Sequence, residues 1–235
     1  MTLKVVVIVF ELGFLGTALP MFGEVKTNQP TQVTVTTTEH ASFAPGGTIR
    51  INHSYGNLNV EGWDQRVVQL TVIKSMPLDY KPKRPEEATR HLSGLRIALE
   101  AKSGTEVVVS TMRTHRRGVR VEYEIQAPWD SKLVIHHGAG SVSVSGLHGA
   151  IEATCSRGDI LLMLPEAVAY SIDARSKFGT VLSDFAGTSH MYLYLLGERY
   201  ATAVSPARRI RLRIGFGGIT IKAAPPEAYA PQAMK

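Results

Sequence analysis

The sequence predicts an all-β fold, a single-domain β-solenoid. This is a right-handed β-helix-like stack of short strands with one short helical insertion. Short strands of alternating polarity and frequent turn signals predict the class. The spacing of glycines narrows the choice of all-β architecture. Gly140, Gly149 and Gly158 fall nine residues apart, and each precedes a strand with apolar residues at every second position. Such a unit cannot bury its apolar face alone, whereas stacked copies can. A constant period therefore favours a solenoid over a sandwich or barrel.

Length and composition agree with one large β domain. The 235 residues are 44% hydrophobic and include 21 glycines, which suits a turn-rich protein with a substantial core. The formal net charge of +6 is spread over many segments. Solubility is its simplest explanation, and attraction to anionic polymers or lipid head groups is the alternative.

The N-terminal segment, residues 1–24, resembles an export signal or membrane tether. Lys4 precedes an apolar run over residues 5–10, and a second apolar run follows Glu11. Glu11 makes a stable transmembrane span unfavourable. We therefore expect an extracytoplasmic location, in the periplasm, in the cell envelope or as a secreted protein. A misassigned start codon or an unusual N-terminal strand is the other interpretation.

Four further segments follow. Residues 25–45 are expected to be a lead-in linker or strand, and residues 46–222 the β-strand-repeat domain. Prolines in residues 76–94 predict a loop that ends in a short helix after Pro85. The proline-containing residues 223–235 are expected to be a disordered tail. Residues 46–130 are less regular, and could belong to the same solenoid or to a small β layer that caps it.

The glycine-led pattern recurs outside its clearest stretch. Gly56, Gly179 and Gly217 each precede an alternating strand, and the 38 residues between the last two correspond to two further coils. The inward positions are expected to form ladders in the core. Candidate ladder residues are Val144, Cys155, Leu162, Ile172, Val181 and Ile219. Cys155 is the single cysteine, so we expect a buried thiol and no intramolecular disulfide.

Several segments are similar to the bacterial putative-adhesin family of β-strand-repeat domains. The similarity covers about residues 45–222. It is carried, in order, by residues 56–64 with 67–70, 123–128, 140–146 and 156–160. The resemblance implies an exported or envelope-associated β-solenoid of unestablished function, with no family-wide catalytic residues. The irregular signal and the proline-rich insertion depart from the family pattern.

A basic stripe is the candidate ligand-facing feature. Arg209, Arg211 and Arg213 alternate with Ile210, Leu212 and Ile214, which predicts three arginines on one strand face. Solvent-facing arginines without a ligand are the simpler interpretation. The most basic segment, residues 113–120, is expected to be a solvated loop, with an anion-binding patch as the alternative.

Three other groups of residues invite functional interpretations. Arg157, Gly158 and Asp159 form an adhesion-type tripeptide, but the repeat already accounts for the turn there. His136, His137 and His148 lack metal-ligand spacing, and His136 and His137 point to opposite strand faces, so we expect surface histidines. Four acidic residues in successive coils could serve a polysaccharide-cleaving enzyme, although acidic residues at turns are common. These residues are Glu152, Asp159, Asp173 and Asp184.

The predicted function is therefore a non-enzymatic, exported β-repeat scaffold that binds envelope or extracellular polymers or proteins. No catalytic residue, cofactor or metal site is expected, and no nucleic-acid partner. Membrane contact is expected only through the N-terminal segment. The alternative is a polysaccharide-acting β-helix lyase or hydrolase, and a cell-surface sensory module is a third possibility.

Overall fold

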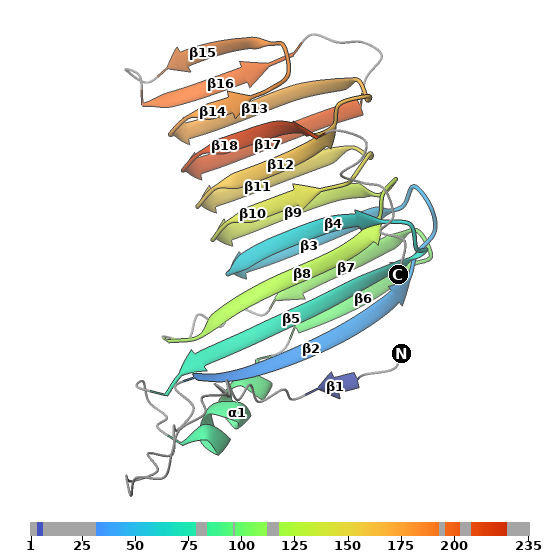
Figure 1. Cartoon of the computed structure of the whole chain (residues 1–235), viewed down its shortest axis with the longest axis vertical. Helices are drawn as coiled ribbons and strands as arrows, with labels where there is room; N and C mark the ends of the chain where they lie inside the picture. The colour runs from blue at the N-terminus through green and yellow to red at the C-terminus, as the bar shows by residue number, and fades with distance from the viewer. Residues whose placement is uncertain are drawn as a thin grey trace, which may run out of the picture.

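A computed structural model describes residues 4–6, 32–78, 84–95, 97–111, 118–192, 196–202 and 208–224. Its strands form a tall two-layered stack with the helix at one end (Figure 1). The prediction of an all-β fold with one short helix is confirmed. That helix, α1 (Pro85–Ser93), begins at Pro85 and carries Glu86 and Glu87 in its first turn, as the sequence predicted for this part of residues 76–94.

The strands alternate with short turns along the chain. Those of the first half are β1 (Lys4–Val6), β2 (Gln32–Ser42), β3 (Thr48–Tyr55), β4 (Asn57–Trp63), β5 (Val67–Pro77), β6 (Ile97–Ser103), β7 (Glu106–Thr111) and β8 (Arg120–Pro128). Those of the second half are β9 (Lys132–Ala139), β10 (Val142–Ser145), β11 (Ile151–Arg157), β12 (Ile160–Pro165), β13 (Tyr170–Phe178), β14 (Val181–Ser183), β15 (Thr188–Tyr192), β16 (Gly197–Ala201), β17 (Arg208–Phe216) and β18 (Ile219–Ala224).

Two mixed sheets make up the layers. Sheet A has the order β1-β2-β5-β8-β4-β10-β12-β18-β14, and sheet B the order β15-β16-β13-β17-β11-β9-β3-β7-β6. The strands from β8 to β14 in sheet A pair in parallel, as do those from β13 to β7 in sheet B. Antiparallel strands flank these parallel regions: β2 and β5 in sheet A, and β6, β15 and β16 in sheet B.

The strands of the two parallel regions form pairs. In each pair the first strand belongs to sheet B, and the next strand along the chain belongs to sheet A. Their spatial order is β7–β8, β3–β4, β9–β10, β11–β12, β17–β18 and β13–β14. The predicted solenoid implies that the strand pairs stack in chain order, and this order is wrong at two places. The pair β3–β4 lies between β7–β8 and β9–β10, and the pair β17–β18 lies between β11–β12 and β13–β14. Every pair presents the same alternation, so the local pattern does not specify which pairs become neighbours.

Five of the glycines predicted to begin strands share one corner of the stack, where the chain passes from sheet B to sheet A. Gly149 does not: it lies between β10 of sheet A and β11 of sheet B, where the chain passes in the other direction. Gly56, Gly140, Gly158, Gly217 and Gly179 all have φ between +121° and +140°. A Cβ on Gly158 would lie 2.0 Å from the Gly140 carbonyl oxygen. Other residues are therefore excluded by backbone conformation and by the close approach of the neighbouring strand pair.

The core lies between the sheets. All six predicted ladder residues are buried, and Cys155 is 1% exposed. They belong to one apolar cluster with residues from both sheets, extending from Phe43 to Ile221. A second, smaller cluster packs Ala88 and Leu92 of α1 against Val35 and Met76 of β2 and β5. The helix thus closes one end of the stack.

Three predictions fall largely outside the described residues. Of the N-terminal segment only Lys4–Val6 is described, as strand β1 antiparallel to β2. Residues 113–117 of the basic segment 113–120 and residues 225–235 of the predicted tail are not described, while Ala223 and Ala224 belong to β18. Within the described part of the chain, no helix is both long and apolar enough to span a membrane.

Candidate binding surface

The basic stripe lies on the outer side of sheet B. Strand β17 buries Ile210, Leu212 and Ile214, so the alternate side chains point away from the core. Arg209 and Arg211 are exposed, and Arg213 is half-buried. The predicted inside–outside pattern of this strand is confirmed, while ligand binding by the stripe stays a prediction.

Neighbouring strands add two arginines that the sequence did not group with the stripe. On β13, Arg175 lies opposite Arg213, and on β16, Arg199 lies opposite Arg175. The register between β13 and β17 joins residues about 40 positions apart, so no local pattern signals it. We name these five side chains, Arg175, Arg199, Arg209, Arg211 and Arg213, the basic face.

Two carboxylates partly neutralise the basic face. Asp173 accepts hydrogen bonds from Arg213 Nη2 and, at 3.1 Å, from Arg199 Nε. Partial burial by itself would raise the pKa of Asp173, but the hydrogen bonds and charges of Arg213 and Arg199 outweigh it and lower this pKa. Arg211 lies 3.8 Å from Glu152 in an exposed pair, which contributes about 0–1 kcal/mol.

The remaining two arginines have no carboxylate partner among the described residues. Arg175 Nε donates a hydrogen bond of 3.0 Å to the Tyr192 hydroxyl, and its guanidinium lies 4.6 Å from the centre of that ring. Arg209 is exposed and forms no ion pair with a described residue. The face therefore retains positive charge, with Arg175 held by Tyr192 and Arg209 exposed to solvent.

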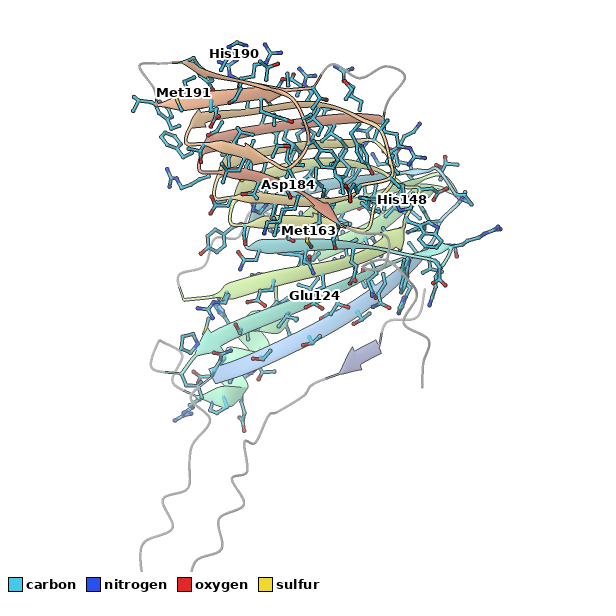
Figure 2. The ribbon with its side chains drawn as sticks, turned by 45° about the horizontal axis from the view of Figure 1, so that its top comes forward. Glu124, His148, Met163, Asp184, His190 and Met191 are labelled. Atoms are coloured by element: carbon cyan, nitrogen blue, oxygen red, sulfur yellow. The ribbon has the colours of Figure 1, made fainter. Side chains whose placement is uncertain are left out.

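The outer side of sheet A has the opposite charge in its central part. Glu61 on β4 and Glu122 and Glu124 on β8 point outward, and adjacent strand pairing places Glu124 beside Asn59. Figure 2 marks Glu124 on this strand. Among the described residues, the two outer sides thus differ in electrostatic character, and the basic face of sheet B suits an anionic ligand better than the acidic central part of sheet A.

The three predicted histidines do not converge. His136 points outward, with its Nδ1 3.2 Å from Asn52 Oδ1, and His148 is half-buried against Trp129. The expectation of surface histidines is wrong for His137, which is 4% exposed and pairs with His53 across 2.8 Å between their Nδ1 atoms. The inward phase of β9 buries it, since His137 follows Leu133 and Ile135 on the core side.

Burial controls the titration of this histidine pair. Desolvation, followed by the charge of His137, lowers the pKa of His53 to about 3, and desolvation also lowers the pKa of His137. Sequence reasoning missed His53, although it occupies the inward phase of β3 after Ile49 and Ile51. Among the described residues, no group of three or more histidine, cysteine or acidic side chains is arranged to hold a metal ion.

Two of the four candidate carboxylates come together: Glu152 on β11 and Asp173 on β13 both lie opposite Arg211 of β17 on the outer side of sheet B. Glu152 and Asp173 contact the basic face, whereas Asp159 Oδ1 accepts a hydrogen bond of 2.8 Å from the Gly218 amide. Asp184 Oδ2 accepts one of 3.2 Å from the Ala223 amide beside sheet A. These acids stabilise the backbone or pair with arginines. Asp173 lies on β13 in sheet B, whereas Asp184 follows β14 of sheet A.

The Arg157-Gly158-Asp159 tripeptide forms part of the glycine corner. Gly158 has a φ of +133°, Asp159 binds the next strand pair, and the Arg157 guanidinium lies 5.9 Å from the Phe216 ring centre. The three residues therefore lie in a stacked corner and do not project as a separate loop.

Comparison with known proteins identifies a shared fold. No family model and no curated protein matches the sequence. The crystal structure of a putative cell adhesion protein from Clostridium sporogenes superposes with a TM-score of 0.51 at 14% identity, over 80% of this chain and 99% of that one. A putative adhesin from Bacteroides fragilis is also found, with a TM-score of 0.29 and 11% identity over 80% and 97% of the two chains. The structural neighbours are thus putative adhesins or cell adhesion proteins from several bacteria.

Proposed function

We propose that this chain is an exported, non-enzymatic, adhesin-like β-repeat scaffold that binds an anionic envelope or extracellular polymer through the basic face. The observation that carries the proposal is the gathering of five arginines, with two carboxylates, on one outer side of sheet B. The fold shared with a putative cell adhesion protein supports an extracytoplasmic role, as does the predicted export signal.

The spacing of the strands in the stack suits an extended anionic polymer. Strands in a sheet repeat at about 4.8 Å, so arginines on β17, β13 and β16 form a row of cations across the strands. A flexible polyanion can contact several members of that row at once, and multiple weak contacts raise its avidity. Guanidinium groups also bind carboxylate and phosphate oxygens through paired hydrogen bonds.

The binding test uses the purified full chain with polygalacturonate, an acidic polysaccharide, and neutral dextran. We expect salt-sensitive binding to polygalacturonate only. Arg209→Ser should weaken it by about tenfold, because one charge-assisted contact is lost. Lys222→Ser, which removes an exposed cation from sheet A, is the matched control and should bind normally. Equal binding by the wild-type chain and a variant with Arg175, Arg209 and Arg211 all changed to serine would exclude the basic face.

The enzymatic alternative has a direct test. Glycoside cleavage needs two carboxyl groups facing the same bond. Glu152 and Asp173 flank Arg211 on one face, but both are engaged with arginines, while Asp159 and Asp184 accept backbone hydrogen bonds elsewhere. Incubation with polygalacturonate should leave its chain length unchanged in size-exclusion chromatography. Shortened chains would replace the scaffold proposal with a polysaccharide-acting enzyme.

A further inference from the structure

An exposed apolar ridge runs along the glycine corner. Backbone hydrogen bonds from the corner glycines place three apolar residues side by side across neighbouring strands. Gly158 bonds to Phe216, Gly217 to Phe178 and Gly179 to Leu196, at 3.0, 2.9 and 2.8 Å. Phe216, Phe178 and Leu196 therefore occupy successive positions across β17, β13 and the start of β16, and we call them the corner ridge.

The corner ridge leaves much apolar surface in water. Phe216 is 52% exposed and Leu196 is 57% exposed, while Phe178 is half-buried. The two phenylalanine rings stack on each other, with centroids 4.7 Å apart and planes 12° apart. Their mutually facing sides are thus covered, and the apolar surface that remains is at the ring edges and outer faces.

Cations flank the ridge. The Lys177 ammonium lies 5.6 Å from the Phe178 ring centre, and the Arg157 guanidinium lies 5.9 Å from the Phe216 ring centre. Both side chains are exposed, and neither forms an ion pair with a described residue. The ridge therefore combines protruding apolar groups with adjacent positive charge.

We propose that the corner ridge docks the protein onto an anionic lipid surface. Phe216, Phe178 and Leu196 would enter the head-group boundary, while Arg157 and Lys177 bind lipid phosphates. Apolar insertion and electrostatic attraction reinforce each other at such a surface. This contact adds to the membrane contact expected of residues 1–24.

Charge and ring packing favour this occupant over others. Sugar rings and nucleic-acid bases bind aromatic side chains through open ring faces, but here the facing sides of the two rings cover each other and a cation lies over each ring. A second copy docking ridge to ridge about a two-fold axis would bring Arg157 and Lys177 close to their own counterparts. Burial among lipid chains needs no particular ring orientation, because the hydrophobic effect is non-directional.

The test measures co-sedimentation of the full chain with vesicles of phosphatidylcholine and phosphatidylglycerol at 3:1, and of phosphatidylcholine alone. We expect binding to the anionic vesicles, weakened about tenfold by Phe216→Ser. Trp129→Ser is the matched control, since Trp129 is an exposed aromatic residue in the turn between β8 and β9, away from the ridge. It should bind as the unaltered chain does.

A second measurement guards against misfolding. In a Phe216→Trp variant, the added indole should shift its emission to shorter wavelength with anionic vesicles and be quenched by lipids brominated on their acyl chains. Absence of the shift and of the quenching would overturn the proposal. So would vesicle binding that Phe216→Ser leaves intact, or a dimer in sedimentation velocity that this substitution dissociates.

The proposal does not depend on polymer binding by the basic face. If Phe216→Ser abolishes vesicle binding and leaves polygalacturonate binding unchanged, the ridge acts as a separate lipid contact. If the substitution weakens only polygalacturonate binding, the ridge belongs to the polymer site and the lipid proposal fails. If Arg209→Ser has no effect on polygalacturonate but vesicle binding still requires Phe216, the proposed function fails alone.

Discussion

At the scale of single residues, two imidazole rings meet inside the core. His53 and His137 occupy paired positions on β3 and β9, and their rings lie nearly parallel, 7° apart. The Tyr123 ring packs edge-on against His53, and Cys155 lies opposite His137 on β11. No carboxylate appears among these contacts, so no opposite charge there compensates a proton on either ring, although backbone hydrogen bonds offset part of the desolvation that lowers the pKa of His137.

This pair should make the fold acid-sensitive. Unfolded histidines titrate near pH 6.5, whereas burial lowers the pKa of folded His53 to about 3. Between these values the unfolded chain binds more protons, so the free energy of unfolding should fall as pH decreases. Urea unfolding at pH 7.5 and pH 5.0 should show this loss, and a variant with His53→Leu and His137→Leu should show a smaller one.

A matched control lies on the same strand. His136 neighbours His137 but points outward, so His136→Leu should retain the pH dependence of the unaltered chain. If the double variant loses as much stability as the unaltered chain between the two pH values, the buried pair is not responsible.

At the scale of elements, the position of β17 departs from chain order. It pairs in parallel with β11 on one side and β13 on the other, although β13 precedes it by about 40 residues. Chain order predicts that Gly217 lies two coils beyond Gly179. Instead, the Gly217 amide donates a hydrogen bond to the Phe178 carbonyl, and a Cβ added to Gly217 would clash with the Gly158 carbonyl oxygen. Loop length does not prevent this insertion, because closing a longer loop adds little entropic cost.

Hydrogen exchange tests the insertion. Amides in β17 have neighbouring strands on both sides, so they should exchange at the rate of global unfolding. The edge strand β15 pairs only with β16 and has mostly exposed side chains, so it should exchange much faster. Figure 2 shows its residues His190 and Met191 at the end of the stack opposite α1. Mass spectrometry of peptic peptides distinguishes the two strands, and fast exchange throughout β17 would contradict its central position.

At the scale of the whole molecule, one core joins both sheets. The main apolar cluster includes residues from β3 and β4 near the middle of the stack and from β13 and β17 toward its end. A continuous core of this kind favours cooperative unfolding, although repeat-like stacks can unfold in parts.

Two probes can test this cooperativity. Far-UV circular dichroism reports all strands, while the fluorescence of Trp63 and Trp129 reports β4 and the turn after β8. We expect the same urea midpoint from both signals, because local opening of the far end would expose much of the shared core. A separate circular dichroism transition without a fluorescence change would show that the β13–β18 end unfolds independently.

Much of the fold follows from local chemistry. Alternation along single strands predicted which side chains are buried, Pro85 marked the beginning of α1, and the glycine-led pattern predicted the corner residues. The outward direction of Arg209, Arg211 and Arg213 follows from the same period of two. These properties depend on residues a few positions apart, so the sequence by itself determines them.

Tertiary structure decided the rest. The order of the strand pairs, the placement of Arg175 and Arg199 beside β17, and the contact of His53 with His137 all depend on pairing between distant segments. Equivalent strand pairs offer nearly the same edge hydrogen bonds to each other, so local patterning leaves several orders open. Packing of the whole core selects one of them, and that selection gathers five arginines on one face and three apolar side chains, two of them exposed, on one corner.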